Sequence, residues 1–166
     1  MKRPPRERQD GRGLRIALLR SAFNAAVVDG LVAGARGALS ESGAREDALE
    51  LVTVPGAFEL PAAALAAARS GRFDAVVALG AVIRGETDHY EHISREAAAG
   101  LSRVALDTGV PVGFGVLTCE TEGQALARSA KGEGNKGAEA ARAALAMVHV
   151  LRKFTTKTQR TRRRKR

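Results

Sequence analysis

Four short, nearly continuous apolar runs are the feature that most limits how this chain can fold. Their sequences are IALL at 16–19, LVTV at 51–54, AVVAL at 75–79 and VGFGVL at 112–117. None of them shows the alternation of apolar and polar residues that a half-exposed strand requires. Runs of this kind are typical of strands buried on both faces, as in a parallel sheet with helices on each side.

Helical patterns separate the first three runs. Asn24 is a plausible N-cap for a helix whose apolar residues between 27 and 39 share one face and which ends near Ser42 and Gly43. After the second run, Pro55 and Gly56 turn the chain into a helix over 58–69. Pro61 is tolerated there because it falls in the first turn.

Two capping patterns mark later helices. Asp88 and Glu91 predict a capping box at the start of a helix with an apolar face, and Thr121 and Gln124 repeat the device after the fourth run. The glycine-rich link KGEGNKG then ends that helix, and a last helix begins near Asn135.

The alternation of strands and helices predicts a three-layer α/β/α fold, a flavodoxin-like single domain with a four-stranded parallel sheet and right-handed crossovers. In such sheets ligands bind beyond the carboxyl ends of the strands. We therefore expect the site in the segments 20–24, 55–59 and 80–89 and in the turn after Leu117.

The net charge of +9 is carried almost entirely by the two ends of the chain. Residues 152–166 contribute +9 without any acid, residues 1–13 contribute +3, and the predicted domain over 14–151 carries −3. A basic tail can bind nucleic acid or another polyanion through its phosphates. A solvated tail is the simpler reading, because Phe154 is the only aromatic residue among these charges.

Other classes of protein are disfavoured. The lone Cys119 cannot form an intramolecular disulfide, and no apolar stretch approaches the length of a membrane span, so we expect a cytoplasmic protein with no membrane partner. The phosphate-loop pattern, GxGxxG, GxSxG and HExxH are all missing.

The predicted edge segments contain candidate chemical groups. His89 falls in the first turn of its helix, where the helix dipole disfavours the imidazolium form, so it could act as a base. The amides near Thr87 form a potential anion site, with Arg128 or Lys136 as the cation. A metal held by His89 and His92 is a weaker alternative, because no third ligand is specified.

Read jointly, these segments resemble the 6,7-dimethyl-8-ribityllumazine synthase family. The motifs in order are AFN at 22–24, VPGAFELP at 54–61, LGAVIRGETDHY at 79–90, PVGFGVLT at 111–118 and GNKG at 134–137. They span about residues 14–151, so both basic tails lie outside the resemblance.

The resemblance implies a transferase of riboflavin biosynthesis. In this family 5-amino-6-(D-ribitylamino)uracil condenses with 3,4-dihydroxy-2-butanone 4-phosphate, giving 6,7-dimethyl-8-ribityllumazine, phosphate and water, with no cofactor and no metal. The attacking amine belongs to the substrate, so holding two reactants together provides much of the rate enhancement. His89 matches the family position that transfers protons.

The resemblance also assigns substrate-binding and phosphate-binding positions. Phe23 matches an aromatic ring that stacks on the pyrimidine, and Glu59 a carboxylate that accepts hydrogen bonds from the ribityl chain. The remaining substrate-binding positions are Ala57, Phe58, Val82, Ile83, Phe114 and Lys136, and the phosphate-binding positions are Glu86, Thr87 and Arg128.

The family builds its active sites between adjacent subunits of a homopentamer, and some members assemble pentamers into an icosahedral shell. The short link SAKGEGNKG at 129–137 is closer to that of shell-forming members than to the longer link of pentamer-only members. The alternative function is a shell or scaffold of the same fold whose basic tails bind RNA or another polyanion.

Overall fold

The structure, a computed structural model, describes residues 9–163, with side chains described as far as residue 155. Its elements in chain order are β1 (Ile16–Ser21), α1 (Ala25–Glu41), η1 (Glu46–Ala48), β2 (Leu49–Val54), η2 (Ala57–Glu59), α2 (Leu60–Arg69), β3 (Ala75–Ile83), α3 (His89–Thr108), β4 (Val112–Cys119), α4 (Glu122–Ser129) and α5 (Lys136–Arg163).

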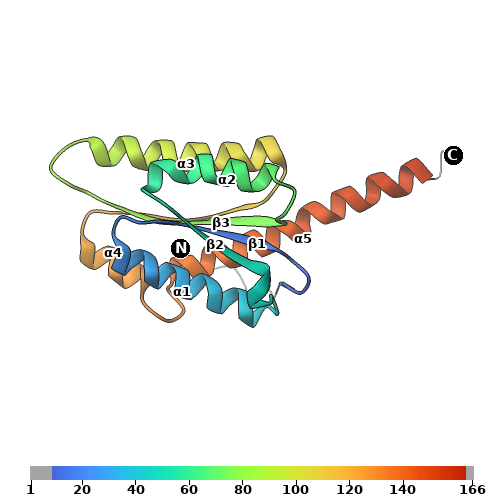
Figure 1. The fold of residues 1–166 in the computed structure, drawn as a ribbon, viewed down its shortest axis with the longest axis horizontal. Helices are drawn as coiled ribbons and strands as arrows, with labels where there is room; N and C mark the ends of the chain where they lie inside the picture. Colours follow the sequence, from blue (N-terminus) through green and yellow to red (C-terminus); the bar gives the residue numbers. More distant parts are fainter. Residues whose placement is uncertain (1–8, 164–166) are drawn as a thin grey trace.

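The four strands form one parallel sheet in the order β2-β1-β3-β4, with helices on both faces (Figure 1). Helices α2 and α3 cover one face, and α1, α4 and α5 cover the other. This confirms the predicted three-layer architecture. The strand order is that of flavodoxin-like folds, in which the chain reverses direction across the sheet between β1 and β3.

Two apolar clusters hold the three layers together. Ile16 and Leu18 of β1 face α1 and α5, whereas Ala17 and Leu19 face α2 and α3. Successive strand residues therefore enter opposite cores, and for this reason the run at 16–19 has no polar position. The predicted apolar face of the first helix is buried throughout, from Val27 to Leu39.

The expectation that all four strands are covered on both faces is wrong for the two edge strands. Leu51 and Val52 of β2 and Phe114 of β4 are exposed. Their apolar side chains fit a strand pattern, but the helices within residues 9–163 leave them partly exposed. The sequence pattern alone does not distinguish burial within a chain from burial between chains.

Helices α1 and α5 approach each other closely because small residues line their contact. A Cβ atom on Gly137 would lie 2.0 Å from the carbonyl oxygen of Leu31, and one on Gly34 would lie 2.0 Å from Asn135 Oδ1. Only glycine fits at these two positions, so the GNKG segment fixes the start of α5 against α1.

Of the predicted caps, only Thr121 makes a side-chain capping bond, while the Gln124 side chain accepts from the Glu120 amide. The Thr121 hydroxyl accepts a hydrogen bond from the Gln124 amide at 3.2 Å. Asn24 and Asp88 occupy the N-cap positions of α1 and α3 but make no side-chain capping bond. The capping box expected from Asp88 and Glu91 is therefore wrong, although α3 begins at the predicted place.

Helix α5 continues well beyond the sheet, to Arg163 (Figure 1). Residues 152–163, expected to belong to a basic tail, are thus helical. The first eight residues of the N-terminal tail and the last three of the chain lie outside the described residues.

Candidate active site

The loops that follow β1 and β3 are joined at the carboxyl edge of the sheet. Asn24 adopts a left-handed conformation with φ 56°, and its side-chain amide donates a 2.8 Å hydrogen bond to the carbonyl oxygen of Ala81. Asn tolerates this backbone conformation better than most residues. The bond crosses the switch point between β1 and β3 and fixes the loop that carries Phe23.

Phe23 and the segment after β2 lie together beside this point. A Cβ atom on Gly56 would lie 3.4 Å from the Phe23 ring and 3.1 Å from the Glu59 carboxylate. Glu59 accepts a 2.9 Å hydrogen bond from the Gly56 amide. The exposed Phe23 ring, 71% accessible, therefore sits next to a carboxylate held in place by its own turn. Ala57 is buried below them, and Phe58 is exposed.

The end of β3 and the following loop supply the next group. Val82 and Ile83 are half-buried and pair with Thr118 and Cys119 of β4. Residues 84–88 then form an exposed loop that contains Glu86 and Thr87. His89 is the first residue of α3, so its exposed ring lies at the carboxyl edge, as predicted.

Three other predicted site residues lie on or beside β4, the edge strand on the side of the sheet away from β2. Phe114, Arg128 and Lys136 line an open hollow of about 250 Å³ along β4. Arg128 donates a 3.0 Å hydrogen bond to the Gln124 carbonyl, and Lys136 pairs with Glu139 at 2.6 Å. Within one chain this hollow contains none of the predicted residues from the β1, β2 and β3 loops.

The structure identifies a positioning residue, Asn135, that the sequence reasoning treated only as a helix start. Its side chain is 2% exposed and donates to the carbonyl oxygens of Gly30, Ser129 and Ala130. Its Oδ1 accepts from the Ala138 amide at 3.0 Å. Asn135 therefore holds the end of α4 and the start of α5 against α1, and so places Arg128 and Lys136 on the same hollow.

The described part of the chain offers neither a metal-binding cluster nor a membrane-spanning helix. Residues 9–163 contain no cluster of three or more His, Cys, Asp or Glu side chains suited to a metal ion. None of the helices within this range has the length and hydrophobicity needed for a membrane span.

The fold and the site define a class: a flavodoxin-like α/β protein whose ligand groups lie at the carboxyl edge of a parallel sheet. Comparison with known proteins gives the family. The family model described as 6,7-dimethyl-8-ribityllumazine synthase matches residues 13–152. The chain belongs to the 6,7-dimethyl-8-ribityllumazine synthase family.

Curated relatives agree with this assignment. A protein named 6,7-dimethyl-8-ribityllumazine synthase from Halorhodospira halophila is 50% identical over 140 residues, which cover 84% of this chain and 90% of the relative. One of the same name from Nitratidesulfovibrio vulgaris is 46% identical over 142 residues, covering 86% of this chain and 91% of the relative. All the predicted site residues lie within residues 13–152, the range that the family model matches.

Proposed function

We propose that this chain condenses 5-amino-6-(D-ribitylamino)uracil with 3,4-dihydroxy-2-butanone 4-phosphate to form 6,7-dimethyl-8-ribityllumazine, phosphate and water. Family membership supports the reaction. The observation that carries the site is the position of the Phe23 ring beside Gly56, whose amide is held by Glu59. An exposed aromatic face next to a fixed carboxylate suits a flat heterocycle that bears a hydroxylated chain.

His89 and Arg128 are assigned complementary roles in this reaction. His89 lies at the mouth of the carboxyl edge, where it can exchange protons during imine formation, phosphate loss and ring closure. Arg128 supplies a positive charge for the phosphate, together with the Thr87 hydroxyl and the amide of Glu86. The Glu86 carboxylate would repel the phosphate, so it is expected to point elsewhere.

The site requires a second copy of the chain. In a single chain the hollow around Arg128 is separate from the loops around Phe23 and His89. A neighbouring subunit that presents its β4 side to these loops would bring the two groups together. Such a head-to-tail contact closes into a ring, which fits the pentamer of the family.

The exposed apolar surface supports the same assembly. A second hollow, of about 390 Å³, lies between α3 and β4. It is lined by the apolar residues Leu101, Leu106, Val112 and Phe114, together with three small residues of α3. Leu106 is 80% exposed and Phe114 is 47% exposed. Apolar side chains gathered in this way are typical of a protein interface.

The first experiment measures turnover. The two substrates are mixed with the protein, and the lumazine product is followed by its absorbance. His89→Gln should lower kcat by about 100-fold or more, because general acid and base catalysis contributes roughly that much. His92→Gln, one turn further along α3, is the matched control and should retain activity. Equal turnover of both variants would contradict the role of His89.

The second experiment tests the shared site. The variants His89→Gln and Arg128→Gln are each prepared, then unfolded and refolded together. If the two residues come from adjacent subunits, random mixing restores about one quarter of the sites, since each site needs one intact copy of each residue. No recovery in refolded mixtures, with full recovery of a wild-type control, would place both residues in one chain.

We also propose an oligomeric state and a cellular location for this protein. The exposed edge strands favour a pentamer, and the short α4–α5 link favours an icosahedral shell of such pentamers. Light scattering would give the mass. A cytoplasmic location is consistent with Cys119, which is free and buried.

A second candidate function is capture of RNA or another polyanion by the basic C-terminal segment. Residues 152–163 continue α5 as a helix outside the body (Figure 1). Purified protein that carries nucleic acid would show a raised ratio of absorbance at 260 and 280 nm. Co-purified nucleic acid together with no measurable turnover would support the scaffold function and contradict the synthase function.

A further inference from the structure

The helical extension of α5 leaves the body at the amino edge of the sheet, opposite the candidate active site. Its first residue, Arg152, pairs with Asp74 at 2.9 Å, and Asp74 directly precedes β3. The loop at 84–88 lies beyond the other end of β3. In Figure 1 the red end of α5 and this loop are at opposite ends of the molecule.

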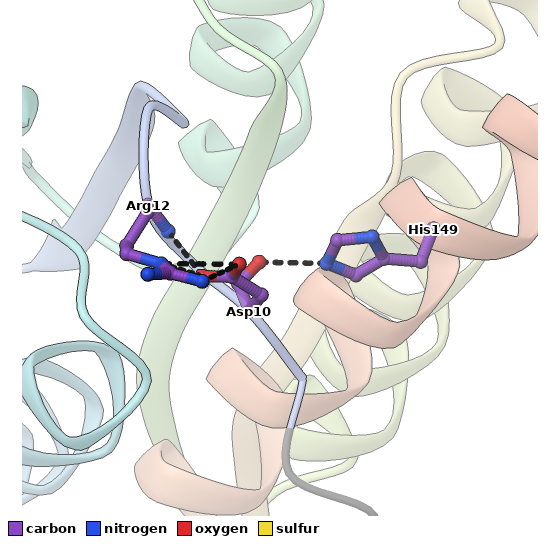
Figure 2. Close-up of polar contacts among 3 residues, drawn as sticks. All are labelled: Asp10, Arg12 and His149. Carbon is purple, nitrogen blue, oxygen red and sulfur yellow. Dashed lines mark hydrogen bonds and ion pairs between the residues drawn. The ribbon is translucent and has the colours of Figure 1, made fainter.

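Two contacts fix the direction in which the helix leaves. The Asp74 carboxylate joins Arg152 to the start of the sheet, because it also accepts a 2.9 Å hydrogen bond from the Arg15 amide. His149 lies less than one turn before Arg152, and its Nε2 is 2.6 Å from the Asp10 carbonyl oxygen (Figure 2). The extension is therefore anchored at its base to both β3 and the N-terminal segment.

The sequence places five of the six Lys and Arg positions in residues 152–163 on one side of this helix, and Arg162 falls outside that side. At about 100° per residue, positions 152, 153, 157, 160 and 163 fall within an arc of about 140°. All five are Lys or Arg, and no acidic residue occurs after Glu139. Arg152 pairs with Asp74, and the other four positions add four positive charges to the extension.

The length of this helix and its scarcity of aromatic residues favour a double-stranded over a single-stranded nucleic acid as the partner. Over residues 152–163 the helix rises about 17 Å, and an α-helix fits the major groove of DNA, which is about 12 Å wide. Binding of single strands normally uses aromatic side chains on which bases stack. Phe154 is the only aromatic residue after Phe114 in the sequence, and it lies at the base of the extension.

We propose that residues 152–163 bind double-stranded DNA through its phosphates, without base-sequence preference, at the end of the molecule away from the active site. This inference rests on the polyanion-binding role proposed above and names its partner. Because an oligomer would present one such helix per subunit, several weak contacts would act together on one duplex.

The test compares two triple variants of the full-length protein. The first, Lys153→Gln, Lys157→Gln and Arg160→Gln, removes charge from the extension and keeps helix propensity. The matched control, Arg69→Gln, Arg72→Gln and Arg103→Gln, removes three exposed charges from the body. Binding is measured by fluorescence anisotropy with a labelled duplex of about 30 base pairs at several salt concentrations.

The wild-type protein and the control should bind the duplex, with affinity falling steeply as salt rises. The extension variant should bind at least tenfold more weakly, and the slope of log affinity against log salt should fall by about two to three units. Equal binding by both variants would overturn the proposal. Tighter binding of a single-stranded RNA or of polyphosphate would overturn the duplex assignment while leaving the polyanion role intact.

Turnover of the same preparations separates this inference from the synthase function. Both variants should form the lumazine product at the wild-type rate. Loss of duplex binding with full turnover would place DNA binding in the extension. Full turnover and no duplex binding by the wild-type protein would remove the inference and leave the enzyme unaffected.

Discussion

Replacing Gly137 with alanine should destabilise the protein, although alanine is normally the better helix former. The added Cβ would lie 2.0 Å from the carbonyl oxygen of Leu31 and 2.7 Å from its carbonyl carbon. Both atoms belong to the backbone of α1, so no side-chain rotation relieves the contact and the two helices must move apart. Overpacking of this kind costs about 1 to 3 kcal/mol.

Gly37→Ala is the matched control, because Gly37 lies on the exposed side of α1 with no atom within 4 Å of an added Cβ. This substitution should stabilise the protein by about 0.5 to 1 kcal/mol. The two variants should therefore differ by about 2 to 4 kcal/mol in the free energy of unfolding.

Thermal unfolding monitored by circular dichroism is a suitable assay. For a chain of this size the expected difference corresponds to about 5 to 15 °C in Tm between the two variants. Both variants add one methyl group to a helix, so a difference in Tm between them cannot come from the type of substitution. Equal Tm values, or a Gly137→Ala protein more stable than Gly37→Ala, would refute the close approach of α1 and α5.

Three further predictions follow from local contacts. Asn24→Ala should lower kcat/KM about tenfold, since it removes both the bond to Ala81 and a residue suited to positive φ, whereas Asn24→Gly should restore the backbone and recover part of the loss. Arg12 lowers the pKa of Asp10 to about 2 through side-chain and backbone hydrogen bonds, so this contact adds stability above the ordinary value of 3.8 that is lost as pH falls towards 2. In an NMR titration Arg12→Gln should return that pKa towards 3.8, and an unchanged midpoint would contradict the contact. The Cys119 thiol is buried and should react with a thiol reagent only after unfolding, so rapid reaction of the folded protein would contradict its burial.

The architecture was predictable because every strand of this sheet carries a continuous apolar run. Ala75 to Leu79 of β3 is buried throughout, and the central position of this strand agrees with its sequence. The run at 51–54 looks equally apolar, yet it forms an edge strand with exposed side chains. The apolar pattern of a run indicates that its side chains are buried, but it does not indicate whether the same chain or another chain covers them.

The candidate site was only partly predictable, for a different reason. The helix start at His89 and the loop at 55–59 have local signals, so their place at the sheet edge could be predicted. The bonds of Asn24 to Ala81 and of Asn135 to Gly30 join residues far apart in sequence. Nothing within either short segment indicates such a partner. Asn24 occupies the predicted N-cap position of α1, but its side chain bonds to Ala81 and does not cap the helix.

The anchored exit of α5 also decides where this protein tolerates additions. A domain genetically joined to the C-terminus would follow a helix that rises about 17 Å over residues 152–163. That helix leaves from the end of the body where the strands start, so a fused cargo or purification tag would stand clear of substrate entry. The C-terminus is accordingly suited to display or immobilisation of the protein.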